Sequence, residues 1–294
     1  MTDIDSIKGL VETAESSGKR ISEVVLEFES RKLNQTPWRL LKKMEETFDV
    51  MEEAVQMGLK LELKSPSGLS GGNAIKLSRF IDKCNINSGV FAKAMVKAVA
   101  VSEYNACMGK IVAAPTAGSS GILPAVLLTA QEEYGISKDK VVRSLFTSAG
   151  IGMVIAKQAS ISGAKGGCQA ECGSASSMAA AALVELLDGT PAMAAHACAI
   201  ALKNILGLVC DPVAGLVEVP CVKRNASGAV NSFEAAILAL AGIESTIPAD
   251  EVILAMGKVG NQMTWELKES AEGGLAATKT AREISCRLGY QQHA

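Results

Sequence analysis

The cysteines that lie beside prolines and glycines are the residues whose type and spacing could do chemistry. Cys210 and Cys221 bound the segment CDPVAGLVEVPC, in which each thiol lies within two residues of a proline, and Cys168 follows two glycines in GGCQAECG. Thiolates on such irregular turns can bind an iron–sulfur cluster, because free backbone N–H groups nearby can hydrogen-bond the cluster sulfurs. Unreactive buried thiols would give the same pattern, since free cysteine is usually a packing residue.

The remaining cysteines carry less information. Cys172 lies four residues after Cys168, a spacing that places both on one face of a helix but differs from the C-x-x-C of a redox pair. Three further cysteines lie within helical patterns and are predicted to be packing residues: Cys84, Cys107 and Cys198. The role of Cys286, near the end of the sequence, stays open. Zinc is a second possibility for the thiols, although His196 and His293 are poorly placed for a zinc finger.

Two loops rich in serine and glycine each lead into a helical pattern. They are SGGN at residues 70–73 and TAGSSG at residues 116–121. Unpaired backbone N–H groups ahead of a helix bind anions, and a carboxylate is a plausible guest. Neither loop matches the phosphate-binding loop of nucleotide-binding proteins. A loop that only caps the following helix would have the same sequence pattern, so the sequence alone leaves both anion binding and simple capping open.

The composition limits the class of protein. The 294 residues are 48% hydrophobic and 20% charged, which is typical of a globular chain. A net charge of -2 without clustered basic residues gives no reason to expect nucleic acid as a partner. The acidic start and the interrupted apolar runs predict no secretory signal and no membrane span. We therefore expect a soluble, cytoplasmic protein, and the sparse, irregularly spaced cysteines argue against a disulfide scaffold.

Helical periodicity is the main structural signal, and it predicts an all-α fold. After Thr36-Pro37, a cap followed by a proline suited to the first helical turn, apolar residues recur three or four apart: Leu41, Met44, Phe48, Met51 and Val55. Aromatic residues are only 4% and alanine is abundant, which favours close helix packing over sheet. The prolines bounding the valine-rich stretch 214–222 argue against a strand there. We predict an N-terminal helical segment over 1–60 and a catalytic domain over 61–294.

Four stretches carry a resemblance to a known family. SGGNAIKLSRF, AAPTAGSSGILPAVLL, GCQAECGSASSMAAAAL and CDPVAGLVEVPCVKRNA resemble the α chain of the bacterial iron–sulfur-dependent L-serine dehydratase. The resemblance runs from about residue 60 to the EGGLA motif near the C-terminus. It implies conversion of L-serine to pyruvate and ammonia without pyridoxal phosphate. It also implies a β chain as partner, in an αβ heterodimer or a higher oligomer, since no such region follows within these residues.

The resemblance further implies a [4Fe-4S] cluster held by Cys168, Cys210 and Cys221. Three thiolates on four irons leave one iron open, and that iron can act as a Lewis acid toward the substrate hydroxyl. The two loops would then hold the substrate carboxylate through Ser70, Gly71, Gly72, Asn73, Thr116 and Gly118. Lys223 and Arg224 would add positive charge, whereas Lys165 is predicted to be a solvated surface residue.

The group that accepts the α-proton is the least defined part of the site. A general base must reach that proton with a pKa near the working pH. Ser119 and Ser120 of the second loop are candidates, and so is a group from the β chain. His196 is another, although a single histidine within PAMAAHACAI is more often a core residue.

Two other functions remain open at this stage. A related iron–sulfur lyase would release hydrogen sulfide from L-cysteine, and its catalytic domain would carry the same motifs. A protein of a different class, a non-catalytic zinc or thiol protein, would use the loops only to cap helices. Substrate preference distinguishes the first from L-serine dehydration, and the identity of the bound metal distinguishes the second.

Overall fold

The computed structural model describes residues 3–60, 62–83 and 89–290, and in these ranges the chain is helical. The strand-like feature in these ranges is an isolated parallel β-bridge between Cys210 and Lys268. The prediction of an all-α fold is therefore confirmed. The longer helices are α1 (Ile7–Ser17), α2 (Ile21–Leu33), α3 (Pro37–Lys60), α4 (Asn73–Ile81), α5 (Gly89–Ala106), α6 (Ile122–Tyr134), α7 (Lys138–Gln158), α9 (Ser174–Leu186), α10 (Pro191–Asn204), α11 (Cys221–Leu240), α12 (Ala249–Gln262) and α13 (Lys279–Arg287).

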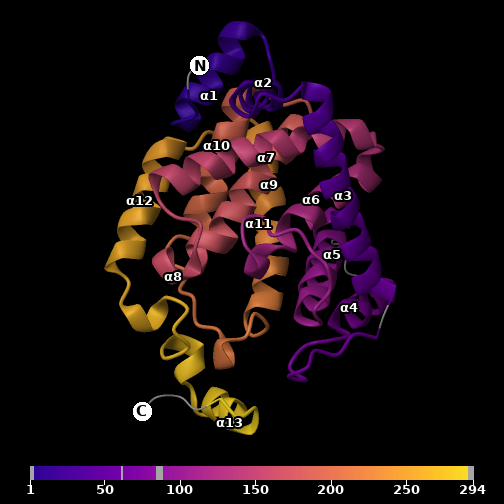
Figure 1. Ribbon diagram of the computed structural model, residues 1–294, viewed down its shortest axis with the longest axis vertical. Coiled ribbons are helices and arrows are strands. Elements are labelled where there is room, and N and C mark those ends of the chain that lie inside the picture. Colours follow the sequence, from indigo (N-terminus) through magenta and orange to yellow (C-terminus); the bar gives the residue numbers. More distant parts are fainter. Residues whose placement is uncertain (1–2, 61, 84–88, 291–294) are drawn as a thin grey trace.

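Helix α9 forms the centre of the molecule. Every one of its residues is buried, and it packs against α6, α7, α10 and α11 (Figure 1). A helix that is apolar on all sides must lie inside the fold. Its sequence, SASSMAAAALVEL, is rich in residues with side chains of one or two heavy atoms, so that the surrounding helices can approach closely on every side.

The N-terminal helices share the main hydrophobic core with the rest of the chain. The predicted stripe on α3 is confirmed: Phe48, Met51 and Val55 are buried in this core, and Leu41 and Met44 pack against it. Figure 1 shows α3 running alongside α5 at the side of the molecule, with α1 and α2 at the opposite end from α13. The division of the chain at residue 60 stays a prediction.

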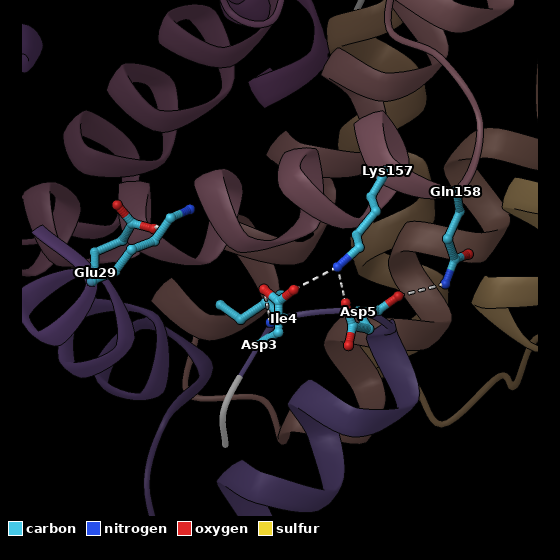
Figure 2. A network of polar contacts seen from close by, with 7 residues as sticks. Asp3, Ile4, Asp5, Glu29, Lys157 and Gln158 are labelled. Carbon is cyan, nitrogen blue, oxygen red and sulfur yellow. Dashed lines mark hydrogen bonds and ion pairs between the residues drawn. The ribbon is translucent and has the colours of Figure 1, made fainter.

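Polar contacts also fix the start of the chain (Figure 2). The ammonium group of Lys157, at the end of α7, pairs with Asp3 at 2.7 Å and with Asp5. The side-chain amide of Gln158 donates to the backbone oxygen of Asp5 at 2.9 Å. Exposed ion pairs contribute little to stability, so these contacts orient a segment that apolar burial stabilises.

Short elements carry the loops that the sequence singled out. These are η1 (Ala117–Ser119), α8 (Gly163–Gly166), η2 (Gln169–Gly173), η3 (Val213–Gly215), η4 (Trp265–Leu267) and η5 (Gly274–Ala277). Elements η1 and η2 contact each other, and both contact α11. Within the described ranges, no helix combines the length and the apolar character that crossing a membrane requires.

Candidate active site

The loops enclose a cavity of about 280 Å³. This volume lies near the lower end of the roughly 300–1,000 Å³ typical of ligand pockets, as suits a small molecule. Residues from five separate segments line it: Thr116, Ala117, Gly118, Ser162, Glu171, Cys210, Pro212, Val217, Cys221 and Glu269. Two of the three cysteines singled out by the sequence, and three residues of the second Ser/Gly loop, therefore face one cavity.

The backbone of Cys210 is held on both sides. Its N–H donates to the Leu267 oxygen at 2.9 Å, and its own oxygen accepts from the N–H of Glu269 at 2.8 Å. The thiol is buried, and burial raises its pKa well above the usual range, with a further contribution from the nearby Glu171 carboxylate. A thiol in this position stays protonated unless a cation binds it.

Cys221 is the first residue of α11 and follows Pro220 directly. The N-terminus of a long helix carries partial positive charge, which favours a thiolate or another anion beside it. Burial nevertheless raises the pKa of the Cys221 thiol to about 12. Cys221 therefore lies at the positive end of the dipole of α11, and its thiol would ionise on binding a metal centre.

Cys168 and Cys172 lie together, as their spacing predicts for one helical face. Their sulfur atoms are 3.4 Å apart and both are buried. The hydrogen bond with Cys172 lowers the pKa of Cys168, and the charge of Arg224 acts in the same direction against the effect of burial. The same hydrogen bond, together with burial, raises the pKa of Cys172.

The arrangement of the three thiols differs from that of a single-ion site. In the described part of the chain, no three histidine, cysteine, aspartate or glutamate side chains converge closely enough for one metal ion. A four-iron cluster needs a wider arrangement, because each thiolate binds a different iron. Cys210 and Cys221 line the cavity, Cys168 is an electrostatic neighbour of both, and soft thiolates are the ligands that such clusters take.

Glu171 is a cavity residue that the sequence reasoning missed. It lies in η2, a π-helical turn, and such turns are frequent at functional sites. One carboxylate oxygen is 3.9 Å from the Cys210 sulfur, and Thr116 lines the same cavity. Burial raises the pKa of Glu171. Its signal in the sequence is that no other charged residue lies between Lys165 and Glu185.

Only part of the second Ser/Gly loop faces the cavity. Thr116 and Gly118 line it, whereas Ser119 and Ser120 are buried within the loop. The hydroxyl of Ser119 is 3.2 Å from that of Thr116, and the hydroxyl of Ser120 donates to the Ala117 oxygen at 2.8 Å. The catalytic roles of the two serines stay predictions.

Asn225 joins this loop to the helix that carries Cys221. Its side-chain amide donates to the oxygens of Gly118 (2.7 Å) and Cys221 (3.0 Å), while its own oxygen accepts from the N–H of Gly121 (2.9 Å). The residue is buried. One side chain therefore fixes the loop relative to the thiol.

The donors of the first Ser/Gly loop are occupied by a carboxylate of the protein itself. Glu103 of α5 is fully buried and accepts from the backbone N–H groups of Gly71 (2.8 Å), Asn73 (3.1 Å) and Ala74 (3.0 Å). The side-chain amide of Asn73 adds a bond of 2.6 Å. The backbone N–H groups of the loop therefore bind an anion, as predicted, but this anion is the Glu103 side chain of the protein itself.

The first loop does not line the cavity. The substrate-binding roles of Ser70, Gly71, Gly72 and Asn73 stay predictions for that reason.

A second carboxylate connects the turn before the first Ser/Gly loop to the segment between Cys210 and Cys221. Glu218 of this segment accepts hydrogen bonds from the hydroxyls of Ser65 (2.7 Å) and Ser67 (2.6 Å).

Of the basic candidates, Arg224 alone turns inward. It pairs with Asp211 at 2.9 Å, donates to the Val209 oxygen at 2.8 Å and interacts with the Cys168 thiol. Lys223 and Lys165 are exposed. Arg224 therefore places positive charge beside the thiols, while the substrate-binding role of Lys223 stays a prediction.

His196 lies away from the cavity. Its Nδ1 accepts from the backbone N–H of Ser245, which follows the C-terminal end of α11. Cys221 begins the same helix, and 20 residues at 1.5 Å each give a length of about 30 Å. The structure therefore does not bring His196 to the cavity, and its contacts fit the alternative of a structural histidine.

Three of the remaining cysteines, Cys107, Cys198 and Cys286, do not line the cavity. Cys198 is fully buried in α10, as expected of a packing residue, and Cys107 is half-buried just beyond the end of α5. Cys286 is exposed on α13. Cys84 and His293 lie outside the described residues.

Comparison with known proteins identifies the class. Residues 16–276 match the family model described as the serine dehydratase alpha chain, and the chain belongs to this family. The match begins at residue 16, so the family extends into α2 and α3, further than the resemblance from residue 60 predicted.

Individual relatives agree with this assignment. The chain is 50% identical over 284 residues to the probable L-serine dehydratase, alpha chain, of Bacillus subtilis (strain 168), covering 96% of this chain and 94% of the relative. It is 47% identical over 282 residues to the L-serine dehydratase, alpha chain, of Peptoniphilus asaccharolyticus, covering 96% and 97%. It is 39% identical over 277 residues to the L-serine dehydratase of Streptomyces coelicolor, covering 91% of this chain and 59% of that protein.

Proposed function

We propose that this chain is the catalytic α chain of an iron–sulfur-dependent L-serine dehydratase, which converts L-serine to pyruvate and ammonia. Membership of the serine dehydratase alpha chain family supports the reaction, as do relatives of this name that align over nearly their whole length. The observation that carries the proposal is the convergence of Cys210, Cys221, Thr116, Gly118 and Glu171 on one small cavity.

Cys168, Cys210 and Cys221 are the residues that would hold a [4Fe-4S] cluster. When bound, the cluster supplies a Lewis acid that stabilises the charge developing on the departing hydroxyl. The chain's part is to keep the three thiols fixed. Cys210 is held by backbone pairing with residues 267–269, and Cys221 by the bond from Asn225. Arg224 places a positive charge near Cys168, which offsets the charge of a thiolate.

The substrate carboxylate would lie against the segment 116–118, where Thr116 and Gly118 line the cavity. The Ser119 hydroxyl lies 3.2 Å from that of Thr116, which lines the cavity, and Ser119 remains a candidate for accepting the α-proton. Ser120 and His196 remain sequence predictions for that step, and a β-chain group is the further candidate.

We propose a β chain as the partner, because relatives that align with this chain over nearly their whole length are named alpha chains. An αβ heterodimer or higher oligomer in the cytoplasm is the expected assembly. Co-expression with the β chain, followed by size-exclusion chromatography with light scattering, tests this. Elution of the α chain alone at all concentrations would contradict it.

The reaction itself is tested with protein that is reconstituted with iron and sulfide under anaerobic conditions together with its β chain. We expect a visible absorption band that exposure to air removes, and formation of pyruvate and ammonia from L-serine. Faster release of hydrogen sulfide from L-cysteine would instead indicate the related desulfidase. Colourless protein containing stoichiometric zinc, with no turnover of either amino acid, would contradict the proposal and leave a non-catalytic thiol protein.

A further inference from the structure

Glu171 places a carboxylate in the cavity without a cationic partner. In the described part of the chain no ion pair includes Glu171, and the nearby Arg224 is paired with Asp211. The residues that line the cavity include a second carboxylate, Glu269, and two thiols, but no lysine or arginine. A cavity with this charge attracts a positively charged group.

Glu171 lies next to segment 116–118, where the substrate carboxylate is proposed to bind. A Cβ atom built on Gly118 would lie 3.5 Å from both carboxylate oxygens of Glu171, and Thr116 lines the same cavity. An α-amino acid carries its ammonium and carboxylate groups on one carbon. A site for it therefore needs an anion for the ammonium directly beside the donors for the carboxylate.

The carboxylate is held in place by its surroundings. A Cβ atom at Gly163 would lie 2.8 Å from one Glu171 oxygen and 3.0 Å from the Cys210 sulfur, so the start of α8 closes tightly over both. Two residues earlier in η2, the side chain of Gln169 donates to the oxygens of Gly166 (2.9 Å) and Met256 (3.1 Å). Such support fixes the geometry before a ligand arrives.

From this placement we propose that Glu171 binds the α-ammonium group of the amino-acid substrate, an inference that rests on the proposed function and extends it. An ion-paired hydrogen bond within a half-buried cavity gives selectivity for amino acids over the corresponding acids without an amine. Glu269, which is exposed at the same cavity, serves as the matched carboxylate for comparison.

The test compares two ligands that differ only in the ammonium group, L-alanine and propionate. Neither has a hydroxyl to eliminate, so calorimetry on the assembled, iron-loaded enzyme measures their dissociation constants without turnover. We expect the unaltered enzyme to prefer L-alanine, and Glu171→Gln to reduce this preference roughly tenfold or more. Glu269→Gln, at the exposed carboxylate, is expected to reduce the preference less than Glu171→Gln does, and Glu171→Asp, which retains the charge, to keep part of it.

Iron content per chain separates this role from the alternatives. Equal iron in the unaltered enzyme and Glu171→Gln, with a lost preference for L-alanine, supports ammonium binding. Loss of iron in Glu171→Gln would make the residue a ligand or support of the metal centre and overturn the proposal. An unchanged preference would also overturn it. Failure of the proposed function is distinguishable, because it appears as absent serine turnover in the unaltered enzyme.

Discussion

At the scale of single residues, the cavity depends on buried amide and carboxylate side chains that bridge its loops. Asn225 joins the loop of Gly118 and Gly121 to the backbone of Cys221, and Asp211 joins Arg224 to the N–H of Leu275. A buried polar group that loses its partner costs about 1–3 kcal/mol. Substitution of such a bridge therefore affects both stability and the placement of the thiols.

Asn225→Ala tests this bridging role. The substitution removes three hydrogen bonds and leaves the buried N–H of Gly121 without its acceptor. We expect a loss of about 1–3 kcal/mol in the free energy of unfolding. Serine turnover per iron-loaded chain should fall roughly tenfold or more, since a small displacement of reacting groups is enough for that. Anaerobic urea denaturation and pyruvate formation measure the two effects.

Asn231→Ala is the matched control on the same helix. Asn231 is also buried and hydrogen-bonded, to the Ala201 oxygen at 2.8 Å and to Asn204 at 2.8 Å, and it does not line the cavity. Its substitution should cost comparable stability but leave turnover per iron-loaded chain unchanged. Equal losses of turnover in both variants would show that Asn225 acts only through general stability.

Sequence reasoning recovered the chemically distinctive residues of the cavity and missed those that support them. Prolines beside Cys210 and Cys221 are local signals, and both thiols line the cavity with Thr116 and Gly118. Glu171 has no comparable signal in its neighbouring residues. The π-helical turn η2 places its side chain, and that turn packs against α9, so its position follows from tertiary contacts.

At the scale of elements, carboxylates from distant helices cap the N-termini of others. Glu103 of α5 accepts from the first N–H groups of α4, and Glu185 of α9 accepts from the N–H of Ser22 in α2 at 3.1 Å. Neither α4 nor α2 has a side-chain hydrogen bond from its own N-cap residue. The first four N–H groups of a helix need partners, and a negative charge at that end is favourable.

Glu103→Gln is expected to loosen the loop at residues 70–73. Hydrogen bonds to charged groups contribute about 1.5–3 kcal/mol, and the amide cannot accept all four bonds equally well. We expect faster hydrogen exchange over residues 70–76, measured by mass spectrometry, and lower stability. Glu185→Gln, which alters a cap distant from the first loop, should lower stability without changing exchange there. Unchanged exchange in Glu103→Gln would contradict the capping role.

Some of the longer helices could be predicted because their apolar residues recur with helical spacing, as on α3. Others could be predicted because an alanine-rich run favours a helix over a strand, as on α9. The short elements could not. The isolated pairing of Cys210 with Lys268 joins segments far apart in the sequence, and only tertiary contacts bring them together. Turns stabilised in this way leave no periodic pattern to detect.

At the scale of the whole molecule, one hydrophobic core includes residues from α1 to α12. Phe48 of α3 is fully buried in it, although it belongs to the N-terminal segment predicted to end at residue 60. Loss of a buried phenylalanine typically costs about 3–5 kcal/mol. If the core acts as one unit, such a loss lowers the stability of every part of the chain together.

Phe48→Ala is therefore expected to shift a single cooperative unfolding transition of the reconstituted chain. Circular dichroism and the visible absorption of the cluster should report the same lowered midpoint. Trp38→Ala, on the same helix at a side chain that is 70% exposed, should leave the midpoint nearly unchanged. Two separate transitions, with the cluster band unaffected by Phe48→Ala, would indicate that residues 1–60 form an independent unit.

The most direct test of the central claim is the iron content of four single-serine variants after anaerobic reconstitution. Cys168→Ser, Cys210→Ser and Cys221→Ser are each expected to lose most of the cluster iron and all serine turnover. Cys172→Ser, whose sulfur lies only 3.4 Å from that of Cys168, is expected to keep both. Full iron content in any of the first three, or its loss in Cys172→Ser alone, would contradict the proposed set of ligands.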